Sequence, residues 1–103
     1  MNNNVINYQI AISAITQIEL LSWKVVDLND ITVLNDFISD SVIFELEQSI
    51  KLKTVELRRA YAIKLPDAII AATALTADLT LISNDRGFSK ISSLKLLNPF
   101  KVA

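Results

Sequence analysis

The spacing of large apolar side chains predicts a strand followed by a helix near the start of the chain. In residues 8–12 these side chains fall at every second position, which is typical of a short strand. Thr16 stands three residues before Glu19, and a hydroxyl and an acid at this spacing are typical of a capping box at a helix N-terminus. We therefore expect a helix from Thr16 to about Trp23.

The middle of the chain repeats this order of elements. A second helix is expected to begin at Asn29 or Asp30, because the apolar residues that follow recur at helical spacing. Residues 41–46 are β-branched and aromatic, which favours a second strand. Residues 47–64 then predict a long amphipathic helix with one apolar stripe and basic side chains outside it.

Pro66 separates that helix from the most apolar part of the chain. Proline lacks an N–H and disfavours helix in the preceding residue, so we expect a new helix with Pro66 as its first residue. Residues 68–77 are apolar nearly all round, which predicts a helix buried on every side. Residues 79–83 are typical of a strand inside a parallel sheet, followed by a turn at 84–87 and a short strand at 95–97.

The alternation of strands and helices predicts an α/β fold with a mostly parallel sheet. With 103 residues, 51% of them hydrophobic, and without a linker or repeat, we expect a single domain spanning residues 1–103. No apolar run reaches the roughly 20 residues that cross a bilayer, and the polar, uncharged start does not resemble a secretory signal. We therefore expect a soluble, cytoplasmic protein that does not bind a membrane.

The composition excludes several kinds of chemistry. The chain has no cysteine and no histidine, so disulfides, thiolate nucleophiles and zinc sites built from these residues are ruled out. A single glycine cannot form a glycine-rich phosphate loop, which excludes nucleotide binding of the P-loop or Rossmann kind. Catalysis at neutral pH therefore depends on carboxylates, lysines, hydroxyls or a bound hard cation.

The charges are distributed unevenly along the chain. Residues 1–47 hold seven acidic residues and one basic residue (net charge −6), whereas residues 48–103 hold four and nine (net charge +5). This asymmetry favours an anionic partner for the second half. The alternative is an ordinary surface with a large dipole.

Three carboxylates follow predicted strands or open a predicted helix. Glu19 and Asp85 come after strands, and Asp67 lies at the start of the apolar helix. Sites in open parallel sheets lie beyond the carboxyl ends of the strands, so these acids can converge there. Converging carboxylates repel one another, and a hard cation such as Mg²⁺ or Mn²⁺ relieves that repulsion and can activate water for hydrolysis.

Each acid also has an ordinary structural explanation. Glu19 is the partner of Thr16 in the expected capping box. Asp67 suits the positive end of a helix dipole, and Asp85 lies in a sequence typical of turns. The joint placement of the three acids, rather than any one of them, favours a metal site.

Several segments resemble the PIN domain family. Residues 64–74 (KLPDAIIAATA) closely resemble the LPDAIIAATA helix of that family, and residues 81–88 (LISNDRGF) resemble its turn of the form L-(T/S)-N-D-x-x-F. Residues 12–21 (ISAITQIELL) are similar to its S-x-I-T-x-x-E-L segment, and residues 97–100 to its usual end. The resemblance extends from about residue 9 to residue 100, in the family's order.

The resemblance implies a fold, an activity and partners. PIN domains of the VapC toxin type are Mg²⁺- or Mn²⁺-dependent endoribonucleases with a three-layer α/β/α sandwich, and they are often homodimers that pair with a small antitoxin. By resemblance, the metal site consists of Glu19, Asp67 and Asp85, which are also the catalytic residues. Ser83 corresponds to a hydroxyl residue of that site. The residues expected to line the metal site are Thr16, Ser83 and Asn84. The basic residues expected to contact RNA phosphates are Lys51, Lys53, Arg58, Arg59 and Arg86.

The chain also departs from the family pattern. The family opens with a strand that ends in an aspartate, but no acid precedes Glu19, and Gly87 stands where many members have another aspartate. We therefore expect a PIN domain shortened at its N-terminus that lacks the usual first strand, which would leave a pairing edge open for dimerisation. Two alternatives follow: a catalytically impaired binding module that associates with an antitoxin or with itself, or a longer natural chain whose upstream residues supply the aspartate.

Overall fold

The computed structural model describes residues 10–24 and 27–99. Its chain falls into two compact units, Met1–Phe44 and Glu45–Ala103, each of which is described by itself. Every strand pair in the described residues is parallel, and one or more helices lie between successive strands along the chain. The predicted α/β fold class with parallel strands is confirmed. No helix in the described ranges is long and apolar enough to cross a membrane.

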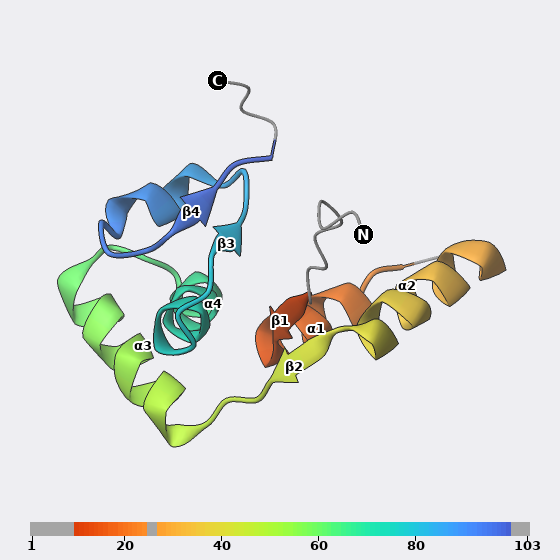
Figure 1. Ribbon diagram of the computed structural model, residues 1–103, viewed down its shortest axis with the longest axis horizontal. Coiled ribbons are helices and arrows are strands. Elements are labelled where there is room, and N and C mark those ends of the chain that lie inside the picture. Colours follow the sequence, from red (N-terminus) through yellow and green to blue (C-terminus); the bar gives the residue numbers. More distant parts are fainter. Residues whose placement is uncertain (1–9, 25–26, 100–103) are drawn as a thin grey trace, which may run out of the picture. The chain divides into compact units, whose positions relative to one another are not determined.

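Among its described residues, the first unit contains one parallel strand pair and two helices (Figure 1). Strand β1 (Ala11–Ser13) pairs with β2 (Val42–Phe44), and Ala11 lies opposite Val42. Helices α1 (Ala14–Leu21) and α2 (Leu28–Asp40) lie between them in sequence. The predicted order of elements is confirmed, although both strands are shorter than expected. The proposed loss of a first strand concerns residues that lie outside the described ranges.

The N-cap of helix α1 lies three residues earlier than the capping box predicted. Ser13, which is 4% exposed, is its N-cap and accepts a hydrogen bond from the Thr16 backbone N–H at 3.1 Å. The hydroxyl groups of Ser13 and Thr16 also lie 3.1 Å apart. Because Ser13 ends β1 and caps the next helix, Thr16 lies inside α1 and cannot cap it. The Thr16–Glu19 capping box was therefore a wrong prediction.

Helix α2 lies close to its predicted position but begins at Leu28. Asp27 is its N-cap, and its Oδ1 accepts a hydrogen bond from the Asn29 backbone N–H at 2.8 Å. Asp30 lies in the first turn. No residue of α2 is buried, so the apolar stripe that predicted this helix stays partly open to solvent.

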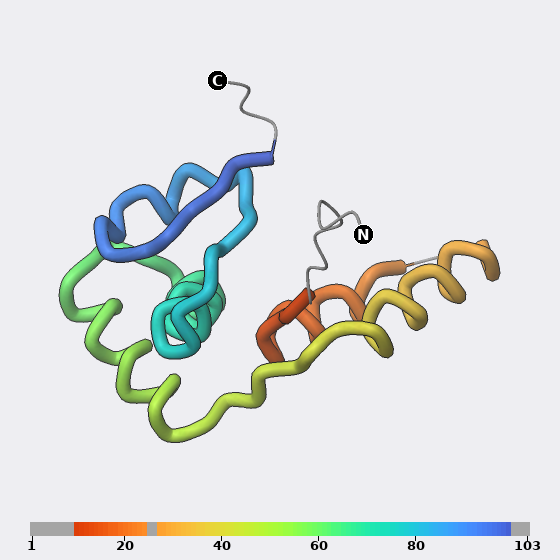
Figure 2. Tube along the Cα trace, in the orientation of Figure 1, coloured from red at the N-terminus to blue at the C-terminus, as the bar shows by residue number. Residues whose placement is uncertain are grey.

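The second unit is built on helices α3 (Gln48–Ala60) and α4 (Leu65–Thr76), which are consecutive along the chain and pack against each other (Figure 2). Helix α3 ends before residue 64, earlier than expected, and buries Ile50, Thr54 and Leu57. In α4, Ala68, Ala71 and Ala72 are fully buried, so small side chains let other parts of the unit approach the helix closely.

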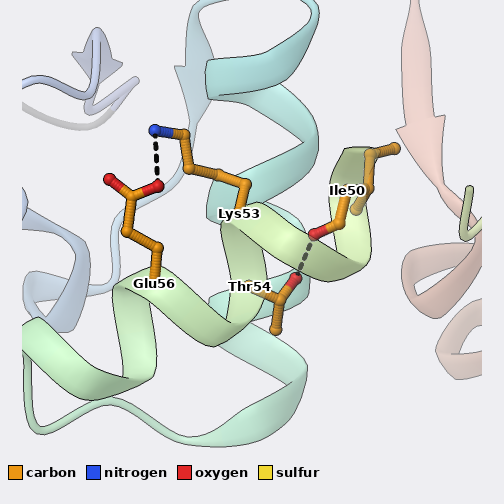
Figure 3. A network of polar contacts seen from close by, with 4 residues as sticks. All are labelled: Ile50, Lys53, Thr54 and Glu56. Carbon is orange, nitrogen blue, oxygen red and sulfur yellow. Dashed lines mark hydrogen bonds and ion pairs between the residues drawn. The ribbon is translucent and has the colours of Figure 1, made fainter. Parts of the chain in front are cut away.

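Thr54 and Thr73 are buried, and each hydroxyl donates to the backbone carbonyl four residues earlier, at 2.7 Å (Figure 3 shows Thr54).

Helix α4 departs from its prediction in two respects. Lys64 is its N-cap, so Leu65 is the first helical residue and Pro66 the second; the missing proline N–H costs nothing there, because the first turn has no acceptor for it. The predicted run 68–77 is also not buried on every side, since Ile70 and Leu75 are only half-buried and Thr76 is exposed. Its buried residues are Ala68, Ile69, Ala71, Ala72, Thr73 and Ala74.

A second parallel strand pair completes this unit. Strand β3 (Leu81–Ile82) pairs with β4 (Leu96–Leu97), and the 3₁₀ helix η1 (Arg86–Lys90) lies between them in sequence. Three apolar side chains anchor this segment in the core, namely Phe88, Ile91 and Leu94. The expected strands at 79–83 and 95–97 are thus present in shortened form.

Asp78 closes α4 in a left-handed backbone conformation, with a φ of 54°. The Leu79 N–H donates to the carbonyl of Ala74 at 2.8 Å, which is typical of a Schellman motif. Lys95, next to β4, donates to Asp78 Oδ1 at 2.8 Å. This hydrogen bond holds the pKa of Asp78 below its ordinary value of 3.8, and the positive charge of Lys95 lowers it further.

Substituting Lys95 with methionine is expected to cause a small, pH-dependent loss of stability. Because the folded protein holds the pKa of Asp78 low, the contact stabilises the fold above pH 3.8 and is lost as the pH falls through the lowered value. Urea unfolding of the wild type and of Lys95→Met, each above and below pH 3.8, measures the difference between their free energies of unfolding. Both side chains are exposed, so added salt should reduce it. A difference that grew toward acid pH would contradict the prediction.

Candidate active site

Asp85 is held in a defined position by its own turn. It follows β3 and is the N-cap of η1, and its Oδ1 accepts a hydrogen bond from the Gly87 N–H at 2.8 Å. Its own N–H donates to Ser83 Oγ at 3.1 Å. The predicted turn is therefore present, and it brings Ser83, Asn84 and Asp85 together. Oδ1 of Asp85 caps the helix, whereas its Oδ2 makes no hydrogen bond or ion pair with the described residues.

The same turn explains why Gly87 suits this position. A Cβ atom at residue 87 would lie 3.2 Å from Asp85 Oδ1, which is tighter than an ordinary van der Waals contact. A side chain there would press on the capping carboxylate. Gly87 therefore leaves room for the close contact between Asp85 and the backbone of η1.

Asp67 lies in the first turn of α4 and is half-buried. No hydrogen bond or ion pair to its carboxylate occurs within residues 10–24 and 27–99. A carboxylate at this end of a helix interacts favourably with the helix dipole. Asp67 is therefore a carboxylate whose oxygens are free to bind a cation.

Glu19 and Thr16 belong to α1 in the first unit. Glu19 is exposed, and its carboxylate has no hydrogen bond or ion pair in the described ranges. The hydroxyl of Thr16 contacts the capping hydroxyl of Ser13, so Thr16 helps to fix the start of α1. Glu19 is thus a free carboxylate on the unit that does not contain Asp67 and Asp85.

The predicted metal ligands fit a cation by their chemistry. Asp67 and Asp85 share one unit and both retain free carboxylate oxygens, which are the donors that Mg²⁺ and Mn²⁺ prefer. Within residues 10–24 and 27–99, no three acidic residues form a group that could hold a metal ion. The convergence of Glu19 with the two aspartates therefore stays a prediction.

The basic residues of the second unit are mostly exposed. Lys51, Arg58 and Arg59 lie on the solvent side of α3, and Arg86 directly follows Asp85 as the first residue of η1. Lys53 instead pairs with Glu56 at 3.2 Å along the same helix (Figure 3). Arg86 is thus the basic residue adjacent to a candidate ligand, whereas those of α3 also suit an ordinary solvated helix face.

Two residues with structural roles near these acids were not predicted. Ser13 caps α1, and a serine immediately before an apolar helix is a signal that could have identified it. Lys90 donates to the backbone carbonyl of Ala62 at 2.8 Å across 28 positions of sequence. A contact with a distant carbonyl leaves no pattern in the sequence, so no signal could have identified Lys90.

Comparisons with known proteins agree with this fold. The family model of the PIN domain matches residues 3–94. A toxin–antitoxin complex from Klebsiella pneumoniae has a chain that is 33% identical, with a TM-score of 0.73, over 89% of this chain and 75% of that one. VapBC2 from Rickettsia felis, solved with a promoter DNA fragment, is 27% identical with a TM-score of 0.70, over 87% and 74% of the two chains.

A third structure supports the fold alone. VapBC-1 from nontypeable Haemophilus influenzae has a TM-score of 0.75 at 19% identity, over 93% of this chain and 78% of that one. No curated protein matches the chain significantly. The family match and the toxin–antitoxin structures together support a family of nuclease toxins. Because the match covers most of its length, this chain belongs to the PIN domain family.

Proposed function

We propose that this protein is a metal-dependent endoribonuclease of the VapC toxin type that hydrolyses RNA phosphodiesters. The observation that carries the proposal is the half-buried Asp67 carboxylate, which has no partner in the described residues and opens the helix that most resembles the family. In this proposal Glu19, Asp67 and Asp85 hold Mg²⁺ or Mn²⁺. A cation bound there supplies an activated water and neutralises charge on the phosphodiester.

The residues around these ligands have supporting roles. Ser83 orients Asp85 by accepting its backbone N–H, and Asn84 lies between them in the turn. Arg86, which follows Asp85 in sequence, would contact a phosphate near the cation, and Lys51, Arg58 and Arg59 would extend the positive surface. The net charge of +5 on residues 48–103 supports an RNA substrate.

The proposed partners are a small antitoxin and a second copy of this chain, in the cytoplasm. The matched structures include a toxin–antitoxin complex from Klebsiella pneumoniae and VapBC2 from Rickettsia felis, which supports an antitoxin partner. An antitoxin that covers Asp67 and Asp85 would block both the cation and the RNA.

Removing the metal is expected to abolish cleavage. The wild-type protein should cut single-stranded RNA in Mg²⁺ or Mn²⁺, lose that activity in EDTA, and regain it when excess Mn²⁺ is added. Gel electrophoresis of a labelled RNA measures the cleavage. Equal cleavage with and without EDTA would overturn the proposal, because a metal-independent nuclease cannot depend on these carboxylates.

A second candidate function is a PIN-fold binding module without catalysis. Large apolar side chains of α1 and α2 that stay exposed, such as Ile18, Leu21 and Val33, favour it, because exposed apolar side chains suit contact with another protein chain. Thermal unfolding in Mn²⁺ distinguishes the two functions. A bound cation at one hundred times its dissociation constant should stabilise the nuclease by about 2.7 kcal/mol, whereas the binding module should not respond.

A further inference from the structure

Lys90 connects the two segments of the second unit that carry the candidate aspartates. It is the last residue of η1, and its Nζ donates to the backbone carbonyl of Ala62 at 2.8 Å. Ala62 belongs to the short connection between α3 and α4, two residues before the Lys64 N-cap of α4. The hydrogen bond therefore ties η1 to the chain that leads into α4.

Each aspartate belongs to one of the two segments that this hydrogen bond joins, namely η1 and the start of α4. Asp85 caps η1 through its bond to the Gly87 N–H, so its carboxylate follows the orientation of that short helix. Asp67 is the third residue of α4, which begins three positions after Ala62. The Lys90–Ala62 bond consequently constrains the relative position of the segments that present Asp67 and Asp85.

Apolar packing alone does not fix the orientation of η1. Phe88 and Ile91 are 4% and 2% exposed and anchor the segment in the core, but apolar contacts are not directional. A hydrogen bond from an ammonium group to a carbonyl is directional and restricts rotation about those anchors. Lys90 thus supplies a constraint that the core does not.

We propose that Lys90 is a positioning residue. Its contact with the Ala62 carbonyl holds the Asp85 carboxylate where it can bind one cation together with Asp67. The inference rests on the proposed function, because it assumes that the two aspartates share a ligand. Lys90 itself contacts neither cation nor RNA in this proposal. Its effect is transmitted entirely through the orientation of η1.

The test compares Lys90→Met with a matched control, Lys95→Met. Both substitutions remove one exposed lysine and one 2.8 Å hydrogen bond from the second unit, but the Lys95 contact lies at Asp78, beyond the opposite end of α4 from Asp67. Isothermal titration of each full-length protein with Mn²⁺ alone measures the dissociation constant. We expect an increase of about tenfold or more for Lys90→Met, the size seen when a residue supporting a metal ligand is lost, and little change for Lys95→Met.

Lys90→Arg is the rescue variant, because arginine can donate to the same carbonyl and should restore tight Mn²⁺ binding. Thermal unfolding without metal should show similar midpoints for all three variants, which separates positioning from a general loss of structure. If Lys90→Met does not fold, Lys90→Gln replaces it, with the same expected weakening. On RNA, Lys90→Met should lower kcat at saturating substrate more than it raises KM.

The outcomes separate the two proposals. A wild-type protein that does not bind Mn²⁺ removes the proposed function and this inference with it. A wild-type protein that binds Mn²⁺ while Lys90→Met and Lys95→Met bind it equally well overturns only the inference. Weakened binding in Lys90→Met, restored in Lys90→Arg, supports it.

Discussion

Replacing Asp67 with asparagine is expected to lower RNA cleavage by about 100-fold or more while the protein stays folded. Asparagine has nearly the same shape but lacks the negative charge that a divalent cation requires, and losing even a supporting residue of a metal site costs roughly 10- to 100-fold. The Asp67 carboxylate makes no hydrogen bond or ion pair in the described ranges, so no such contact is lost. The remaining cost is the interaction with the helix dipole, about 0.3–1 kcal/mol.

Asp30→Asn is the matched control for this experiment. Asp30 also lies in the first turn of a helix, α2, so its substitution repeats the loss of a charge near a helix N-terminus outside the proposed site. Both variants should be purified in parallel with the wild type, and their initial rates on the same single-stranded RNA compared. Wild-type activity in Asp67→Asn would remove Asp67 from the metal site, and equal losses in the two variants would indicate a general effect of charge.

Replacing Ile91 with alanine is expected to lower the free energy of unfolding by roughly 2–5 kcal/mol. Ile91 is 2% exposed and is the largest fully buried side chain of the described residues. The substitution removes three carbon atoms from a packed interior and leaves a cavity, whose lining loses its contacts. A domain of this size has a total stability of roughly 5–15 kcal/mol, so this loss is a large fraction of the total.

Urea unfolding followed by circular dichroism measures this loss, and Ile82→Ala is its control. Ile82 is the same residue type in the same unit, but it is 59% exposed, so its truncation removes far less buried surface. We expect Ile82→Ala to cost less than about 1 kcal/mol. Equal destabilisation by the two substitutions would show that Ile91 is not the core anchor that its burial indicates.

The order of elements and the most apolar helix were predictable from local pattern. Residues 65–76 form a helix with Pro66 in its first turn and carry six buried residues, as the continuous apolar run indicated. The turn at Asp85 was also predictable, because Asn, Asp and Gly within four residues (84–87) favour local hydrogen bonds such as the one from the Gly87 N–H to Asp85. These features depend on contacts between residues only a few positions apart.

The boundaries were less predictable, because competing local signals are resolved by packing. Two hydroxyl residues, Ser13 and Thr16, have side chains that can cap the first helix. Because β1 pairs with β2 up to Ser13, the helix begins directly after Ser13, which is therefore the N-cap. The strand expected at residues 79–83 became Leu81–Ile82, because its length is set by how many residues of Leu96–Leu97 are available to pair. A strand has no hydrogen bonds of its own, so its extent depends on its partner.

The sequence by itself determined the family, the succession of strands and helices, and the three acids proposed as ligands, because motifs and periodicity are properties of neighbouring residues. Only the tertiary structure decided that Asp67 is half-buried without a partner in the described residues, and that Lys90 reaches the carbonyl of Ala62. Both depend on segments far apart in the chain. A backbone carbonyl is the same at every residue, so the sequence carries no mark of which one a lysine will find.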